Sequence, residues 1–204
     1  KGKLALNFEY GVFRAFCAAV NAMPYGLSIS IAKSLANTAF SVFRFKRKRT
    51  LDRIFSVFPG ISKREAVLIA KESLANVAMS AVEMIRAPRM DRRWMDKYVV
   101  DGVHYKDKLQ SYVDEGKGVV VMVPHSGNWY MAAWSMAKYG LPLVSIAARQ
   151  RNPKIDAWMK RQYGDIEILE RGNAKVLVEI KKRLNSGRVF AILPDLRVPQ
   201  KDVE

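Results

Sequence analysis

Residues 119–129 read Val-Val-Val-Met-Val-Pro-His-Ser-Gly-Asn-Trp, and they are the strongest indication of the fold class of this 204-residue chain. The run Val119–Val123 is continuous and mostly β-branched, which is typical of a strand buried on both faces of a sheet. Pro124 ends the run, and a helix is expected to begin at Asn128. The stretch therefore places His125 at the carboxyl end of a core strand, where open α/β sheets bind their ligands.

Strands and helices alternate on either side of this stretch. We expect strands at Tyr98–Val100, Val119–Val123, Leu143–Ala147, Ile166–Leu169 and Val189–Leu193. Helices are expected at Lys106–Glu115, Asn128–Tyr139, Lys154–Tyr163 and Ala174–Asn185. A glycine suited to a left-handed cap follows each of these helices, at Gly116, Gly140, Gly164 and Gly187. The pattern predicts an α/β domain over residues 97–204, with a mixed, mostly parallel sheet flanked by helices.

Residues 1–96 are predicted to form a helical, membrane-associating region. The apolar segments Leu4–Ala22 and Leu27–Phe45 are separated by a break near Pro24. We expect two amphipathic helices there and not a membrane span, which needs about 20 mostly apolar residues.

A further helix is predicted after the turn at Phe58-Pro59-Gly60. Ser62 and Glu65 are spaced as a capping box, so this helix begins near Ser62. It is expected to run to about Arg86, and residues 87–96 are expected to form a basic loop.

The net charge of +16 favours an anionic partner. The basic run Arg44–Arg49 directly follows an apolar segment, a pattern typical of a helix on anionic lipid, where each cation contributes about 1 kcal/mol. A helical pair that caps the core and carries a solvated basic turn fits the same pattern. A nucleic-acid partner fits less well, because the cations lack interleaved aromatic residues or a helix-turn-helix pattern.

Several residues near His125 are candidates for substrate binding. Ser126, Gly127 and Asn128 lie at a helix start, where free amides can hold an anion or a developing oxyanion, and Ser126 or Asn128 can cap the helix. On placement alone, His125 is equally a catalytic residue or a hydrogen-bonded structural one. Ser126 lacks the Gly-x-Ser-x-Gly pattern of a hydrolase nucleophile.

The chain carries a set of motifs at characteristic places. They are Arg53, Phe58-Pro59, Glu65, Val100-Asp101-Gly102, Gly116-Lys117-Gly118, His125-Ser126-Gly127-Asn128-Trp129, Asn152-Pro153 and Leu193-Pro194-Asp195. With them the chain resembles the bacterial lipid A biosynthesis acyltransferase family, within the glycerolipid acyltransferase superfamily and related to phosphatidylinositol mannoside acyltransferases. The resemblance implies a glycerolipid-acyltransferase-like core, and we expect residues 97–204 to be incomplete at the carboxyl end.

The resemblance also implies a reaction and its partners. His125 would act as the general base that activates a hydroxyl of a membrane glycolipid, such as a lipid A precursor. That hydroxyl would attack an acyl-CoA or acyl carrier protein thioester, with no cofactor, no metal and no acyl-enzyme. An anionic membrane surface would be a further partner. The expected location is the cytoplasmic face of the bacterial inner membrane, with peripheral or N-terminal attachment.

This sequence departs from the family pattern at Tyr130, where the family has the carboxylate that orients the histidine. A phenol, with a pKa of about 10, does not replace a carboxylate at neutral pH. Either the activity is lost or changed, which would make the protein a silent lipid- or protein-binding relative, or another carboxylate serves. Asp195 follows the strand Val189–Leu193, and we hypothesise a His125–Asp195 pair. A turn or cap residue is the alternative role for Asp195.

Basic side chains are expected at the same edge of the sheet. Arg149 and Arg151 follow the strand Leu143–Ala147, and Arg197 follows Asp195. Guanidinium groups match phosphate, so these arginines are candidates for binding the donor or the acceptor. Each one alone is more often a solvated surface residue, and only as a group at one edge of the sheet are they equally explained as a binding site.

Overall fold

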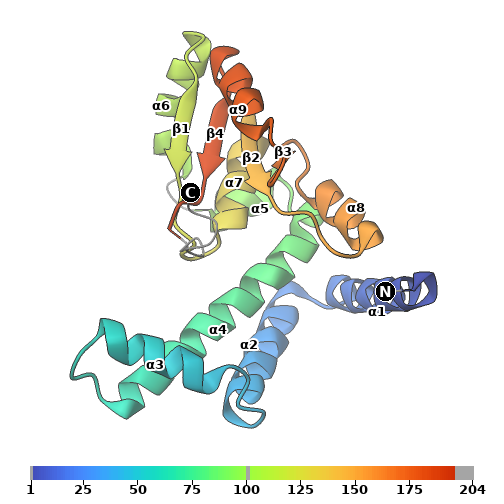
Figure 1. Ribbon diagram of the computed structural model, residues 1–204, viewed down its shortest axis with the longest axis vertical. Helices are drawn as coiled ribbons and strands as arrows, with labels where there is room; N and C mark the ends of the chain where they lie inside the picture. The colour runs from blue at the N-terminus through green and yellow to red at the C-terminus, as the bar shows by residue number, and fades with distance from the viewer. Residues whose placement is uncertain (1, 100–101, 196–204) are drawn as a thin grey trace. The chain divides into compact units, whose positions relative to one another are not determined.

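A computed structural model describes residues 2–99 and 102–195, without the side chains of residues 102–105. The chain divides into two compact units, one of residues 15–86 and one of residues 1–14 with 87–204 (Figure 1). Residues 87–96 and the start of the first helix therefore group with the sheet.

The second of these units is built on a parallel sheet of four strands. The strands are β1 (Val119–Met122), β2 (Leu143–Ala147), β3 (Glu167–Glu170) and β4 (Val189–Ile192). Their order in the sheet is β1-β4-β2-β3, and every pairing is parallel. The predicted α/β class and these four strands are confirmed, and every strand end lies within one residue of its predicted position.

Helices alternate with the strands and cover both faces of the sheet (Figure 1). The helices are α6 (Gly102–Asp114), α7 (Trp129–Lys138), α8 (Pro153–Gln162) and α9 (Val176–Asn185). Apolar side chains of α6 and α7 pack on one face against Leu143 and Val189, which are almost completely buried. α9 packs across β4 and β3. The alternation holds the carboxyl ends of the strands together at one edge.

The strand that precedes His125 differs from the prediction. We expected β1 to be buried on both faces, but Val120 is 54% exposed and Met122 is 74% exposed. That expectation was wrong because β1 is an edge strand. Among the described residues α9 packs over β4 and β3, and the side chains on one face of β1 stay exposed. A run of β-branched residues does not by itself distinguish an edge strand from a central one.

The segment before α6 also differs from the prediction. The expected basic loop contains a 3-10 turn (Ala87–Arg89) and the helix α5 (Arg92–Tyr98). Asp91 accepts a hydrogen bond from the Trp94 amide and caps this helix, so Tyr98 is helical and does not begin a strand. Val100 lies outside the described residues. His104 lies within α6, which begins at Gly102.

The glycines after the helices fulfil two physical requirements. Gly116, Gly140, Gly164 and Gly187 have the left-handed backbone that their predicted capping role requires. Gly118 is needed for a different reason, because a Cβ atom there would lie 2.3 Å from the carbonyl oxygen of Leu184 in α9. The Gly-Lys-Gly sequence before β1 therefore permits both the turn and the close approach of α9.

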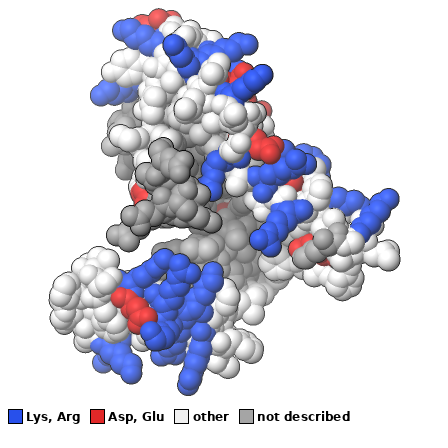
Figure 2. Space-filling view, in the orientation of Figure 1, with Lys and Arg blue, Asp and Glu red and all other residues white. Residues whose placement is uncertain are grey.

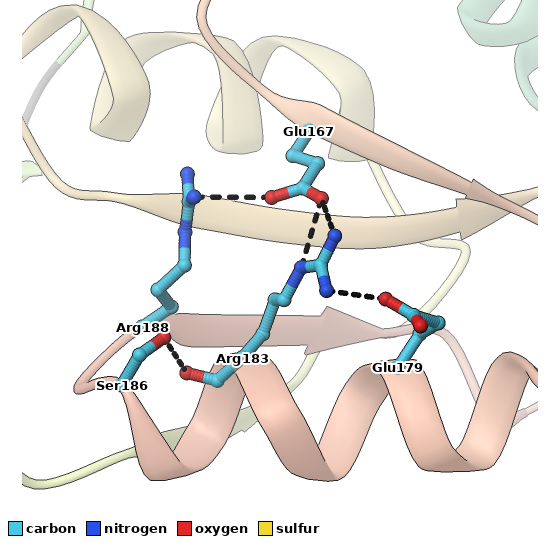
Figure 3. A network of polar contacts seen from close by, with 5 residues as sticks. All are labelled: Glu167, Glu179, Arg183, Ser186 and Arg188. Carbon is cyan, nitrogen blue, oxygen red and sulfur yellow. Dashed lines mark hydrogen bonds and ion pairs between the residues drawn. The ribbon is translucent and has the colours of Figure 1, made fainter.

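An ionic network ties α9 to the sheet (Figure 3). Glu167 of β3 accepts hydrogen bonds from Arg183 Nε at 2.9 Å and from Arg183 Nη2 at 2.7 Å. Arg188 lies 3.0 Å from the other oxygen of Glu167, and Glu179 pairs with Arg183 one turn away. The hydrogen bonds from Arg183 are the main reason that the pKa of Glu167 lies below its ordinary value.

The unit of residues 15–86 is all helical. It contains the end of α1 (Lys3–Ala22), then α2 (Tyr25–Ser41), α3 (Arg47–Val57) and α4 (Lys63–Arg86). α2 and α4 pack along each other through small residues, including Ala32, Ala36, Ala66 and Ala70. Over the residues described, no helix has the length and apolar character required to span a bilayer.

Two local predictions for this unit are confirmed. The helical conformation is interrupted between α1 and α2, at Pro24. Ser62 and Glu65 form the reciprocal capping box, with distances of 3.1 and 3.2 Å, at the start of α4. At the other end of α4, Arg86 donates to the backbone carbonyls of Val20 and Met23, at 2.7 Å each.

Candidate functional site

Two neighbouring strands bring His125 and Asp195 together. β1 and β4 are paired in register, and the pairing continues to a hydrogen bond from the Val123 amide to the Ile192 carbonyl. His125 and Asp195 each lie three residues beyond the last paired residue of their strand. Residues that are 70 positions apart therefore meet at the carboxyl edge of the sheet.

The Asp195 carboxylate holds His125 at two points. One oxygen lies 2.6 Å from Nδ1 of the imidazole, and the other accepts from the His125 backbone amide at 2.7 Å. This grip fixes both the position and the rotation of the ring. With a proton on Nδ1 donated to Asp195, the lone pair on Nε2 is available to a substrate.

The surroundings keep Asp195 ionised and leave both side chains accessible. The His125 side chain is 26% exposed and that of Asp195 is 39% exposed. The hydrogen bond from the His125 ring, followed by that from its amide, lowers the pKa of the Asp195 carboxyl. Asp195 is therefore a carboxylate at neutral pH and can stabilise a positive charge on the imidazole.

The loop after His125 leads directly into α7. Gly127 has a φ of 59°, a left-handed conformation that glycine adopts without strain. Asn128 caps α7, with its side-chain oxygen accepting from the Met131 amide at 3.0 Å. The ring of Trp129 lies edge-on to His125 at 5.1 Å between centroids. Ser126 and Gly127 are exposed beside the histidine, and Asn128 has the capping role that the sequence left open between it and Ser126.

Tyr130 is not brought to His125. Its side chain is buried in the core, and its hydroxyl donates a short hydrogen bond to the backbone carbonyl of Gln162, at the end of α8. Burial raises the pKa of this phenol well above its ordinary value. The position at which the resemblance implies an orienting carboxylate thus holds a neutral packing residue, and the carboxylate next to the histidine follows another strand.

The predicted arginines divide between described and undescribed residues. Arg149 and Arg151 are exposed beyond the end of β2, at the same edge as His125, but β4 lies between β2 and β1. Arg149 also lines a small cavity of about 90 Å³. Asp156, in the same lining, pairs with Lys160 at 2.9 Å and accepts from the Gln150 amide. Arg197 lies outside the described residues.

Sequence reasoning did not assign a role to Asn152. This residue is almost fully buried and caps α8 through the Lys154 amide. Its amide nitrogen also donates to the Leu6 carbonyl of α1 at 2.8 Å. The Asn-Pro motif therefore starts a helix and attaches the beginning of α1, and the proline at the first helical position was the available signal.

A second cavity of about 450 Å³ lies away from the histidine. It is lined by the ends of α7 and α8 and by α5, including Arg92, Trp134, Lys138 and Arg161. α7 and α8 end where β2 and β3 begin, so this cavity lies at the opposite edge of the sheet from His125. It was missed because residues 87–96 were expected to be a loop.

Comparisons with known proteins agree on one family. The model of a family described as bacterial lipid A biosynthesis acyltransferase matches residues 7–204. A phosphatidylinositol mannoside acyltransferase of Mycolicibacterium smegmatis is 38% identical over 84 residues. That alignment covers 40% of this chain and 26% of the length of the relative.

Proposed function

Because the chain belongs to the bacterial lipid A biosynthesis acyltransferase family, we propose that it transfers a fatty acyl chain from a thioester to a hydroxyl of a membrane glycolipid. The donor is acyl-CoA or acyl carrier protein. The acceptor is a lipid A precursor or a related glycolipid, a choice supported by the phosphatidylinositol mannoside acyltransferase among its relatives. The protein acts at the cytoplasmic face of the bacterial inner membrane as a peripheral or N-terminally attached enzyme.

The observation that carries this proposal is the His125–Asp195 contact at the carboxyl edge of the sheet. Asp195 accepts a hydrogen bond from the Nδ1–H group of His125, so Nε2 is free to remove the proton of the acceptor hydroxyl. The resulting oxygen attacks the thioester carbonyl carbon and forms a tetrahedral oxyanion. A base positioned in this way contributes about 10²- to 10⁴-fold to the rate.

Collapse of the tetrahedral intermediate breaks the carbon–sulfur bond and forms the ester. The imidazolium of His125 then returns the proton to the departing thiolate, which leaves as the free thiol of the donor. The first-turn amides of α7 are suited to stabilising the oxyanion, because a helix N-terminus favours negative charge. In this sequence of steps Asp195 holds the ring and stabilises its transient positive charge.

The proposal is tested with labelled long-chain acyl-CoA or acyl carrier protein and a bacterial lipid extract. His125→Ala is expected to lose at least about 100-fold in transfer rate. Ser126→Ala, next in the chain, is the matched control and is expected to keep most of the activity. The parent protein is expected to form no acyl-enzyme. Thermal unfolding of each variant verifies the fold.

Two outcomes distinguish the competing interpretations. Transfer that persists in His125→Ala, or an acyl group attached to Ser126, would refute the assigned chemistry. Lipid binding without transfer from either donor would favour a silent relative. The main sequence argument for that relative was Tyr130, and the contact between Asp195 and His125 weakens it.

A further inference from the structure

A cluster of basic side chains surrounds an open hollow of about 600 Å³ where α2 leads into α3. Its six cations, which we call the basic hollow, are Arg44, Lys46, Arg47, Lys48, Arg49 and Arg53. Figure 2 shows Lys and Arg side chains gathered over this part of the helical unit, with few acidic side chains beside them. The hollow belongs to the unit of residues 15–86, whereas His125 belongs to the other unit.

Most of this positive charge is not neutralised within the protein. Lys48 pairs with Asp52 at 2.8 Å, and both side chains are largely exposed. For the other cations of the hollow, the described part of the chain provides no ion pair. Like charges gathered in this way repel one another, and an anion that enters the hollow relieves the repulsion.

The start of α3 adds to this positive potential. Lys46 is the N-cap residue and makes no capping hydrogen bond, and the first turn contains Arg47, Lys48 and Arg49 but no acid. A helix N-terminus carries partial positive charge and unpaired amides, so cations are unfavourable there and anions are favourable. The cations at the start of α3 are therefore electrostatically unfavourable, and a bound phosphate would stabilise this helix start.

Apolar side chains stand exposed beside the hollow. Phe43 is 77% exposed and Phe45 is 53% exposed, and both lie in the turn between α2 and α3. Leu27, Ile31 and Leu35, four residues apart, form an exposed stripe along α2. Cations next to exposed aromatic and aliphatic groups match a bilayer surface, where headgroup phosphates lie beside acyl chains. A soluble acidic carrier protein or a nucleic acid would leave that apolar surface in water.

We propose that the basic hollow binds the phosphate of an anionic phospholipid headgroup and so docks the α2–α3 corner on the membrane. The exposed Phe43 and Phe45 enter the boundary between headgroups and acyl chains. The inference rests on the proposed function, since docking brings the enzyme to the membrane that contains its acceptor. It goes further by assigning the contact to one corner of the helical unit and to one lipid class.

The test measures binding of the full-length chain to vesicles of phosphatidylcholine alone or mixed with phosphatidylglycerol. Arg49→Gln with Arg53→Gln removes two exposed, unpaired cations that are one helical turn apart. The expected effect is about 30-fold weaker binding to the anionic vesicles, because each surface cation contributes about a factor of five. Lys181→Gln with Lys182→Gln, on the exposed surface of α9, is the charge-matched control and is expected to bind as the parent does.

Two further variants complete the test. Arg49→Lys with Arg53→Lys keeps the charge and is expected to restore binding, which separates charge from any effect on folding. Phe43→Ser with Phe45→Ser is expected to weaken the part of the binding that survives high salt, because salt screens the ionic contribution and not the apolar one. Thermal unfolding reports whether each variant is folded.

Several outcomes would overturn the inference. One is an equal loss of vesicle binding in the Arg49/Arg53 and Lys181/Lys182 variants. Another is equal binding to neutral and anionic vesicles. A third is binding to acyl carrier protein or duplex DNA without binding to anionic vesicles. Displacement by millimolar inorganic phosphate would assign the hollow to a free anion instead. Vesicle binding is measured without donor or acceptor, so its failure does not bear on acyl transfer. Absence of transfer to detergent-dispersed acceptor would refute the proposed function alone.

Discussion

Replacing Asp195 with asparagine tests the proposed pair most directly. The carboxylate accepts two hydrogen bonds, at 2.6 Å from Nδ1 and at 2.7 Å from the backbone amide of His125. Asparagine has one acceptor oxygen and one donor nitrogen, so it satisfies only one of these contacts as they stand. If its amide nitrogen faces the ring, the imidazole must carry its proton on Nε2, which is the wrong tautomer for a base.

The expected loss of transfer rate for Asp195→Asn is about 100-fold or more, at nearly unchanged KM, because the ring loses its orientation and its countercharge. The assay is the transfer of labelled acyl chains, with kcat and KM measured separately for Asp195→Asn, Asp195→Ala and His125→Ala. Since Asp195 is 39% exposed, added formate should partly restore Asp195→Ala but not His125→Ala. A normal kcat in Asp195→Asn, or equal formate rescue of both alanine variants, would show that Asp195 does not orient His125.

Three further substitutions test the packing and the polar contacts of the fold. Gly118→Ala is expected to lower the free energy of unfolding by roughly 2–4 kcal/mol, because its Cβ atom would lie 2.3 Å from the Leu184 carbonyl oxygen. An unchanged midpoint of denaturant unfolding would contradict this close approach. Tyr130→Phe should lower the free energy of unfolding by about 1 kcal/mol, because a buried hydrogen bond is lost. The kcat for acyl transfer should stay within a few-fold of the parent value, whereas a large loss of kcat would make Tyr130 catalytic. Glu167→Gln should cost about 1–2 kcal/mol at neutral pH through its contacts with Arg183. Folding lowers the pKa of Glu167, so the stabilisation is fully present above pH 4.5 and is lost as the pH falls through the lower pKa of the folded state. The stability difference between the parent and Glu167→Gln should therefore shrink in acid, and a difference that grows in acid would contradict this prediction.

Local rules of the chain specified much of the fold in advance. The left-handed glycines after α6 to α9, the capping box at Ser62 and the break at Pro24 depend on neighbours within a few residues. Asp91 is a favourable N-cap residue and caps α5, but the cations around it led us to expect a loop. Errors of this type come from competing local signals.

Three features could be predicted from the residues alone: His125 follows a strand, an α/β sheet follows a helical region, and the family motifs are present. The pairing of β4 with β1, the edge position of β1, the contact of Asp195 with His125 and the burial of Tyr130 became known only from the fold. The difference lies in the sequence separation of the interacting residues. Caps, turns and periodicity depend on residues a few positions apart, whereas strand order depends on packing among segments up to 70 residues apart, and no local pattern encodes it.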